Sequence, residues 1–263
     1  MRLFILCTCS FIICCMNLFS TNPSSLSKEW KLVWNDEFNY TGLPDTTKWS
    51  YHVGGSGWGN EELQFYTENR LENARVENGT LIIEAKKEPW QGMNYTSARL
   101  HTRYKGDWQY GKIEVKAKLP KGRGTWPAIW MLSSNITKWP EDGEVDIMEH
   151  VGYDQGVINA SVHCKKYNWR DNTHKKVAKL VADCSDQFHV YGMEWNVDSI
   201  QISVDGGVFF SFANDHTGYD AWPFDNKLFL ILNIAIGGNY GGAKGVDDSI
   251  WPQKMEVEYV RVW

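Results

Sequence analysis

Cysteine is scarce in most of this chain. Four of the six cysteines fall within the first 15 of 263 residues, and only Cys164 and Cys184 follow them. Without a CxxC spacing, the two make at most a weak metal site. As an even pair in an oxidising compartment they predict one disulfide, which would close a loop of about twenty residues and contribute roughly 3 kcal/mol. Two free buried thiols are the alternative.

An excess of positive charge is also missing. The chain has 27 Lys and Arg against 32 Asp and Glu, a net charge of −5 and a pI near 5.8. This balance gives no electrostatic case for a nucleic-acid partner. Linkers, internal repeats and low-complexity blocks are absent as well. The length therefore fits one large domain from residue 28 to residue 263.

The long apolar run of the chain lies at its beginning. One Arg precedes an apolar stretch from Leu3 to Phe19, and the polar sequence TNPSSLS follows. This arrangement predicts a signal peptide over residues 1–20, with Ser20 as the last residue removed. An uncleaved anchor is the alternative, although the run is short for a membrane span. We expect a secreted, extracellular protein with no membrane attachment after cleavage. Five N-x-S/T sequons are consistent with export: Asn39, Asn78, Asn94, Asn135 and Asn159.

No segment after this leader shows a long 3.6-residue period. Short runs alternate apolar and polar residues instead, as in 113-IEVKAKL, where every second residue from Ile113 to Leu119 is apolar. Gly, Asn and Pro punctuate the gaps, as in 204-VDGG and 237-GGNYGG. Many short strands with turn signals predict an all-β sandwich of antiparallel strands.

Aromatic residues are abundant, with 14 Trp, 12 Tyr and 11 Phe. That density exceeds what a core of this size needs. Exposed rings stack on flat apolar faces, and sugar rings offer such faces. For any single tryptophan, a place in the core is the alternative.

The stretch 143-GEVDIMEH-150 places three acids within six residues. Carboxylates this close repel one another and are rarely buried unless they are paired or used. Side chains of a regular strand alternate between faces, so Glu144 and Asp146 would lie opposite Glu149. One extra residue near Ile147 or Met148, a β-bulge, would return Glu149 to the face of the other two acids.

Two carboxyl groups on one face are the equipment for glycoside hydrolysis. One attacks the anomeric carbon and the other protonates the leaving oxygen. A separation of roughly 5–5.5 Å predicts retention of configuration, and a wider gap predicts inversion. A calcium site and a solvated strand face are the alternatives. Calcium loops favour Gly and Asn with Asp rather than Val, Ile and Met between the acids, and a solvated face would not need the bulge.

The same stretch resembles the E-x-D-x-x-E signature of family sixteen glycoside hydrolases, in the bulged form of laminarinase-type endo-β-1,3-glucanases. The resemblance extends along almost the whole chain after the leader, including 59-GNEELQFYT, 97-SARLHT, 111-GKIEVKAKLPKGRGTWPAIWML and 228-LFLILNIAIGGNYGG. It implies a β-jelly roll of two curved antiparallel sheets with an open cleft across the concave face. It also implies a retaining endo-glycosidase that hydrolyses β-1,3-glucosidic bonds in laminarin-like β-glucans.

The resemblance assigns roles to the acids and to one histidine. Glu144 is the nucleophile, and Glu149 is the general acid and then the base that activates water. Asp146 orients Glu144 and tunes its charge. His163 corresponds to a histidine on the neighbouring strand, near the leaving-group subsite. For a lone histidine, a purely structural role is the alternative.

Four further positions correspond to residues that meet sugar. Trp126 and Trp130 belong to the GTWPAIWM run; they are four apart and would share a strand face, so one of them could belong to the core. Asn60 and Arg99 correspond to polar residues that hydrogen-bond sugar hydroxyls near the cleavage point. A simple ion pair with an acid is the alternative for Arg99.

Calcium is the one cofactor to which the resemblance points, and none is required for the chemistry. Some family members bind calcium on the convex side, and the matching positions are Glu37, the carbonyl of Gly79, and Glu258. The usual residue at the last position is Asp, and Glu is one methylene longer, which disfavours the site here.

Other functions remain open from the sequence. Related folds cut mixed-linkage β-1,3-1,4-glucan, agar, carrageenan or xyloglucan, or act as transglycosylases. Glucan-recognition proteins share the fold but lack the catalytic acids, which this chain keeps. We expect a polysaccharide substrate and a monomer.

Overall fold

Two β-sheets face each other in the part of the chain that the structure describes. The computed structural model describes residues 29–263, and Lys31–Trp263 form one compact unit. The signal peptide predicted for residues 1–20 lies outside the described residues. Within them, no helix is long and apolar enough to cross a membrane. The predicted all-β sandwich is confirmed.

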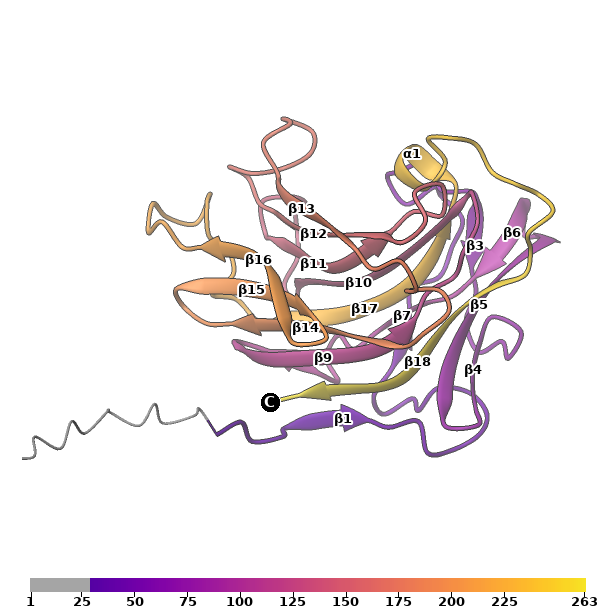
Figure 1. Ribbon diagram of the computed structural model, residues 1–263, viewed down its shortest axis with the longest axis horizontal. Helices are drawn as coiled ribbons and strands as arrows, with labels where there is room; N and C mark the ends of the chain where they lie inside the picture. Colours follow the sequence, from indigo (N-terminus) through magenta and orange to yellow (C-terminus); the bar gives the residue numbers. More distant parts are fainter. Residues whose placement is uncertain (1–28) are drawn as a thin grey trace, which may run out of the picture. The chain divides into compact units, whose positions relative to one another are not determined.

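The first sheet has ten strands; most of them form the lower layer in Figure 1, and the last strands of its main path rise along the right-hand side. Along its main path the order is β16 (Gly207–Ala213), β15 (Ser199–Val204), β14 (His189–Trp195), β9 (Gly111–Lys118), β18 (Gln253–Val262), β5 (Thr80–Trp90), β6 (Met93–Ser97) and β3 (Gln64–Tyr66). β1 (Trp34–Asp36) pairs with β18, and β4 (Ala74–Glu77) pairs with β5. The pairing is antiparallel except between β3 and β6, which run parallel.

The second sheet has eight antiparallel strands and carries the segment with the three acids. Its order is β13 (Lys175–Leu180), β12 (Val157–His163), β11 (Glu144–His150), β10 (Thr125–Ser133), β17 (Leu228–Ile236), β7 (Arg99–His101) and β2 (Ser50–Tyr51), and β8 (Asp107–Trp108) pairs with β17. A single-turn helix, α1 (Gly238–Gly241), follows β17. Figure 1 shows β10 to β13 as neighbouring strands of the upper layer.

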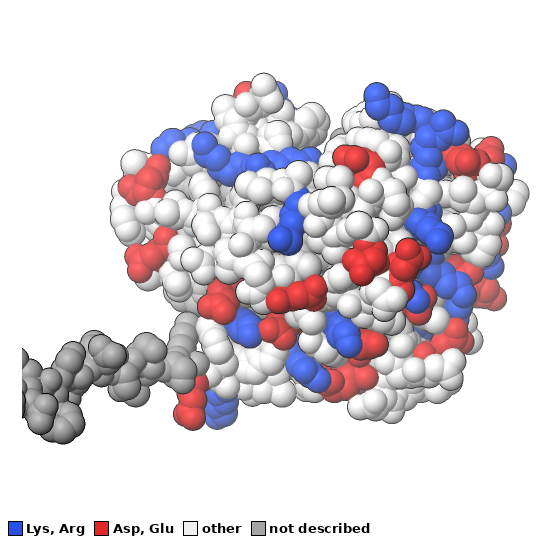
Figure 2. All heavy atoms as spheres, in the orientation of Figure 1, with Lys and Arg blue, Asp and Glu red and all other residues white. Residues whose placement is uncertain are grey.

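The alternation in the sequence sorts side chains between the core and the solvent. In β9, Ile113, Val115 and Ala117 are buried in the core between the sheets. Their neighbours pair on the outer face, as in Lys116 with Glu258. Figure 2 accordingly shows both signs of charge interspersed over the lower half of this face. All nine residues of β17 are buried.

The predicted β-bulge is present in β11. Asp146 pairs with Ser161 of β12 and Glu149 pairs with Asn159, so three residue steps on β11 oppose two on β12. Both residues between these acids, Ile147 and Met148, are buried in the core. The extra residue shifts the phase of the strand, and Asp146 and Glu149 therefore share its other face.

The predicted disulfide between Cys164 and Cys184 is wrong, because both residues are free, buried thiols. The register of β12 and β13 gives the reason. Val162 pairs with Lys175 at one end of the ladder and Val157 with Leu180 at the other. Cys164 follows the first end and Cys184 follows the second, across a ladder about 17 Å long. A disulfide needs Cα atoms within about 7 Å.

Candidate active site

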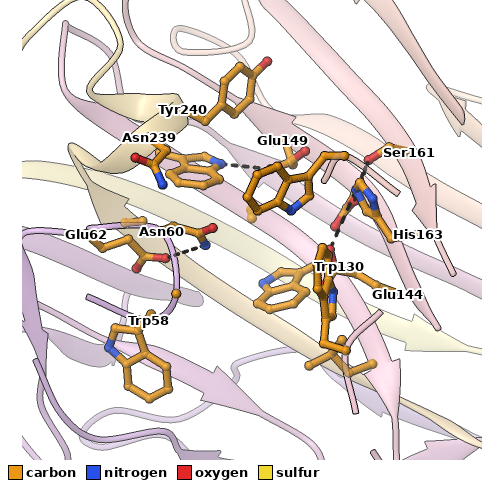
Figure 3. A pocket seen from close by; sticks show the side chains of 18 of the residues that line it. Trp58, Asn60, Glu62, Trp130, Glu144, Glu149, Ser161, His163, Asn239 and Tyr240 are labelled. Atoms are coloured by element: carbon orange, nitrogen blue, oxygen red, sulfur yellow. Dashed lines mark hydrogen bonds and ion pairs between the residues drawn. The ribbon is translucent and has the colours of Figure 1, made fainter. Parts of the chain in front are cut away.

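A cavity of about 700 Å³ lies over the eight-stranded sheet, on the side away from the core (Figure 3). Side chains from β7, β10, β11, β12 and β17 form its floor. All eight residues that the sequence predicted for catalysis and sugar binding line it: Asn60, Arg99, Trp126, Trp130, Glu144, Asp146, Glu149 and His163. Both Trp126 and Trp130 therefore face the cavity, and the alternative that one of them belongs to the core does not hold.

Each of the three acids accepts a hydrogen bond from a neighbouring side chain. The indole N–H of Trp139 donates to Glu144 Oε2 at 3.0 Å, and that of Trp126 donates to Glu149 Oε1 at 2.9 Å. The hydroxyl of Ser161 donates to Asp146. Glu144 and Glu149 oppose Leu132 and Ala128 of β10, with Asp146 opposite Trp130 between them.

His163 adds a positive charge to this cluster. Its Nε2 lies 3.3 Å from Asp146 Oδ2 and 3.9 Å from Glu144 Oε1. Burial alone would lower the pKa of His163, but the hydrogen bond and charge of Asp146, with the charge of Glu144, raise it to about 9. At neutral pH the ring is therefore an imidazolium, which holds negative charge in the middle of the site.

The two glutamates sit in surroundings that favour the protonated form. Burial raises the pKa of Glu144 and of Glu149, and the charge of Asp146 raises both further. Nearby cations act in the opposite direction: His163 lowers the pKa of Glu144, and Lys176 and, less strongly, His163 lower that of Glu149. The pKa of Glu144, about 8, stays above that of Glu149, about 7, so the pKa values do not by themselves make Glu149 the acid. His163 Nε2 lies 3.9 Å from Glu144 Oε1, and this contact stabilises Glu144 as a carboxylate.

A second polar group lies on the opposite side of the cavity, toward β7. Arg99 is buried with its guanidinium between two rings, 4.7 Å from the centre of Trp58 and 4.6 Å from that of Trp130. Trp130 Nε1 donates to Asn233 Oδ1 at 2.7 Å. Within the described residues, the guanidinium of Arg99 forms no salt bridge with an acid and lies between the two rings instead, so the ion-pair alternative does not hold.

Asn60 and Glu62 extend this polar group. Asn60 Nδ2 donates to Glu62 Oε1 at 3.2 Å, and the hydroxyl of Tyr66 donates to Glu62 Oε2 at 3.2 Å. Asn233 Nδ2 in turn donates to the hydroxyl of Tyr66 at 3.0 Å. Figure 3 shows Asn60 and Glu62 across the cavity from His163 and Ser161. The site therefore has polar groups on both sides of the acids.

Several lining residues escaped the sequence analysis. Tyr240, on α1, accepts hydrogen bonds from Asn159 Nδ2 at 3.0 Å and Lys176 Nζ at 2.9 Å, and its ring lies against Trp126. The glycines of 237-GGNYGG were a usable signal: Gly238 has φ +71°, and a Cβ there would lie 2.7 Å from the Asn60 carbonyl. The sequence around Trp139 and Ser161 did not point to the site. Trp139 reaches the acids from a loop, and Ser161 does so through the register of β12 against β11.

The predicted calcium positions do not fit an ion as they are arranged. Both carboxylate oxygens of Glu37 accept hydrogen bonds from Arg261, each at 2.8 Å. The carboxylate of Glu258 pairs with Lys116. Calcium binding at Glu37, Gly79 and Glu258 would have to displace these cations, so it stays a prediction that the contacts disfavour.

Elsewhere in the described residues, one set of ligand atoms is close enough to hold a metal ion. These atoms belong to Glu144, Asp146 and His163 and lie within 4.8 Å of one another. A metal needs the neutral imidazole, whereas His163 has a pKa of about 9 and is charged. The set is better explained as an acid cluster balanced by an imidazolium.

Comparison with known proteins identifies the family. The sequence model of "Glycosyl hydrolases family 16" matches residues 60–261. This chain belongs to glycosyl hydrolase family 16. A "Beta-glucanase" from Rhodothermus marinus is 48% identical over 97% of this chain and 92% of its own length. A "Glucan endo-1,3-beta-glucosidase" from Cryptopygus antarcticus is 39% identical over 89% of this chain and 92% of its own length.

Solved structures of family 16 members confirm the jelly-roll fold. The laminarinase from Rhodothermus marinus superposes with a TM-score of 0.87 at 49% identity, over 89% of this chain and 97% of that chain. A "non-specific endo-beta-1,3(4)-glucanase" with "1,3-beta-D-cellobiosyl-glucose at active site" superposes with the same TM-score at 47% identity, over 92% and 97%. The protein is a glycoside hydrolase of the laminarinase-like kind.

Proposed function

We propose that this family 16 enzyme cleaves internal β-1,3-glucosidic bonds of laminarin-like β-glucans, with retention of configuration. The observation that carries the proposal is the bulged β11 strand, which puts Glu144, Asp146 and Glu149 on one face of a cavity lined by tryptophans. Two carboxyl groups in such a site supply an attacker and a proton donor. The β-glucanases among its relatives support the choice of substrate.

The reaction follows from the contacts of the two glutamates. Glu144 attacks the anomeric carbon while Glu149 gives its proton to the leaving oxygen, which leaves a glycosyl-enzyme on Glu144. Glu149, now a carboxylate, takes a proton from water, and that water releases the sugar. The Trp139 N–H and the His163 charge stabilise Glu144 as a carboxylate at the start and as the leaving carboxylate at the end.

Mixed-linkage β-1,3-1,4-glucan is a second candidate substrate. It is favoured by the likeness to the structure described as a non-specific endo-β-1,3(4)-glucanase. The cavity continues on both sides of the acids, as an enzyme that cuts within a chain requires.

Reducing-sugar release from laminarin, lichenan and agarose by the purified protein tests this function. We expect fast release from laminarin, and release from lichenan as well if the mixed-linkage candidate holds. Proton NMR of the first product should show the β-anomer before mutarotation. A folded protein that releases sugar from agarose alone, or whose first product is the α-anomer, would contradict the proposal.

We also propose that the protein is exported and acts as a monomer. The sequence of residues 1–20 supports export, and four of its five sequon asparagines are exposed, whereas Asn159 is buried. Mass spectrometry of protein recovered from the medium should show a chain that begins after Ser20. Light scattering should give the mass of one chain.

A further inference from the structure

A second hollow, of about 320 Å³, lies on the outer face of the ten-stranded sheet, over β4 and β5 at the right-hand end of Figure 1. Ala74 and Val76 of β4 and Ile83 of β5 are buried in the core, so the residues that alternate with them face outward. The hollow is lined by Leu71, Glu72, Arg75, Glu84 and Lys86. None of these lines the cavity with the three acids, which lies over the other sheet. We call this second site the outer hollow.

An exposed tryptophan adjoins the outer hollow. Trp90, at the end of β5, has 37% of its surface exposed. The guanidinium of Arg70 lies 4.6 Å from the centre of the Trp90 ring and covers one of its faces. Arg70 Nε also lies 3.5 Å from Glu72 Oε2, so the same guanidinium joins Trp90 to the lining of the hollow. Leu71, which is 49% exposed, adds an apolar surface beside it. The site therefore combines a ring face with an open hollow.

The charged groups around the outer hollow are held in place by ion pairs. Arg75 Nη1 lies 2.8 Å from Glu84 Oε2, and Arg70 Nη1 lies 2.6 Å from Glu88 Oε1. Arg70 Nη1 also donates to Oδ1 of Asn73, a buried residue, at 2.7 Å. Hydrogen-bonding groups and the face of Trp90 are thus positioned before any ligand arrives, which lowers the entropy cost of binding.

The charges around the outer hollow balance one another. Four cations and four carboxylates surround it: Arg70, Arg75, Lys86, Lys254, Glu72, Glu77, Glu84 and Glu88. A polyanion would gain little from this balance. A neutral ligand that both donates and accepts hydrogen bonds fits it, and sugar hydroxyls do both. Among residues 29–263, Lys86 forms no salt bridge, so its ammonium group is free to donate to such a ligand.

We propose that the outer hollow and Trp90 form a second binding site for a β-glucan chain, separate from the cavity in which bonds are cut. Trp90 is the stacking face, and Lys86 and Glu72 bind sugar hydroxyls. The choice of glucan as the ligand rests on the proposed function. Because the two sites lie over different sheets, each can hold a different chain of one insoluble particle. Attachment through the outer hollow raises the effective concentration of chains at the cavity.

The test compares a substrate that occupies one site at a time with one that occupies both. Laminaritetraose is a short soluble chain, whereas a particulate, insoluble β-1,3-glucan offers many chains together. For Trp90→Ala we expect the wild-type kcat/KM on laminaritetraose, and an initial rate on dilute particles that is lower by about fivefold. Trp90→Phe keeps a ring and should restore most of that rate. Lys86→Ala, which leaves the ring in place, should lower the rate on particles alone, by about twofold.

Tyr104→Ala is the matched control. Tyr104 is exposed and has a guanidinium against its ring, that of Arg103 at 4.9 Å, but it lines neither the cavity nor the outer hollow. It should match the wild type on both substrates. A rate on particles that Trp90→Ala leaves unchanged would overturn the second site. So would an equal loss on laminaritetraose, which would place the effect in the cavity or in the fold.

Failure of the proposed function would be visible separately. If the wild type released sugar from neither substrate, that function would be contradicted, and the second site would be judged by binding alone. Sedimentation of the wild type and of Trp90→Ala with the particulate β-1,3-glucan gives the dissociation constant of each. Binding about fivefold weaker without the Trp90 ring would support the site. Equal dissociation constants, or no binding by the wild type, would overturn it.

Discussion

At the scale of single residues, the site works through the charges placed around two glutamates. Burial acts on Glu144 and Glu149 alike, so it cannot by itself make one an acid and the other a nucleophile. The neighbours make the difference. Glu144 lies 3.9 Å from the imidazolium of His163, whereas Lys176, which reaches the site beside Tyr240, acts on Glu149 more strongly than His163 does.

Replacing Glu144 by Gln should abolish hydrolysis of laminarin and leave glucan binding intact. The amide cannot form the glycosyl-enzyme, but it keeps the size of the side chain and can still accept from Trp139. The loss should reach several orders of magnitude in kcat, with affinity for laminarioligosaccharides by calorimetry changed less than about tenfold. Turnover at the wild-type rate would rule out Glu144 as the nucleophile.

Replacing Lys176 by Met should move the alkaline limb of the rate profile to higher pH. Glu149 must be protonated to act, so activity falls as pH rises through its pKa. The charge of Lys176 lowers that pKa, and its removal therefore raises it. The measurement is kcat/KM for laminarin against pH. Lys179→Met is the control, since Lys179 is on the same strand but lies against Phe209. Coincident limbs for the two variants would contradict the assignment.

At the scale of elements, the bulge in β11 decides whether the acids meet. It was predictable because the sequence sets three acids against a strict two-residue alternation, and one extra residue resolves the conflict. β13 was not predicted, because both of its faces are exposed and its sequence lacks apolar alternation. Trp139 and Ser161 were missed for a related reason: a contact made by a loop or a cross-strand register leaves no periodic trace.

Deleting Ile147 should remove the bulge without turning Glu149 to the other face. Glu149 would follow Asp146 by two residues, and two steps on β11 would oppose the two steps from Ser161 to Asn159, so both acids would still face the cavity. We therefore expect a variant that still cleaves laminarin but whose free energy of unfolding is lower by about 2–5 kcal/mol, because the core loses one buried side chain. Ile147→Val is the control; it should cost about 0.5–1.5 kcal/mol in urea unfolding and keep the activity. A folded deletion variant without activity would contradict the view that the bulge acts only by setting the phase of the strand.

The two thiols give a second test at this scale. Cys164 and Cys184 are buried at opposite ends of the β12–β13 ladder. Iodoacetamide should modify neither in the folded protein and both in denaturant without any reductant, as peptide mass spectrometry would show. If both cysteines stayed unmodified in denaturant until a reductant was added, the two would be joined by a disulfide after all.

At the scale of the whole molecule, buried histidines make the fold sensitive to acid. Burial lowers the pKa of His150 to about 4, from 6.5 in the unfolded chain. Between these two pKa values the unfolded state binds a proton at His150 and the folded state does not. The free energy of unfolding therefore falls as pH falls from 6.5 toward 4, by roughly 3 kcal/mol for this group. Urea unfolding of His150→Gln should show a flatter slope over this range. His216→Gln, at an exposed position, should follow the wild type; a slope unchanged by His150→Gln would contradict the assignment.

Removing calcium with EDTA tests whether Glu37, Gly79 and Glu258 bind the ion. Because Arg261 and Lys116 already hold the carboxylates of Glu37 and Glu258, we expect the same melting temperature in calcium and in EDTA. A fall of several degrees in EDTA, absent in Glu37→Gln, would show that calcium displaces Arg261.

The position of β13 also bears on how the molecules behave when crowded together. It is the outermost strand of its sheet, so one row of backbone donors and acceptors has no further strand beside it in the described chain. Such an edge invites another molecule to extend the sheet, and charged side chains are a common defence. Lys175, Lys176 and Lys179 stand on this strand. Lysines on this strand therefore oppose edge-to-edge pairing of two sheets beside the cleft.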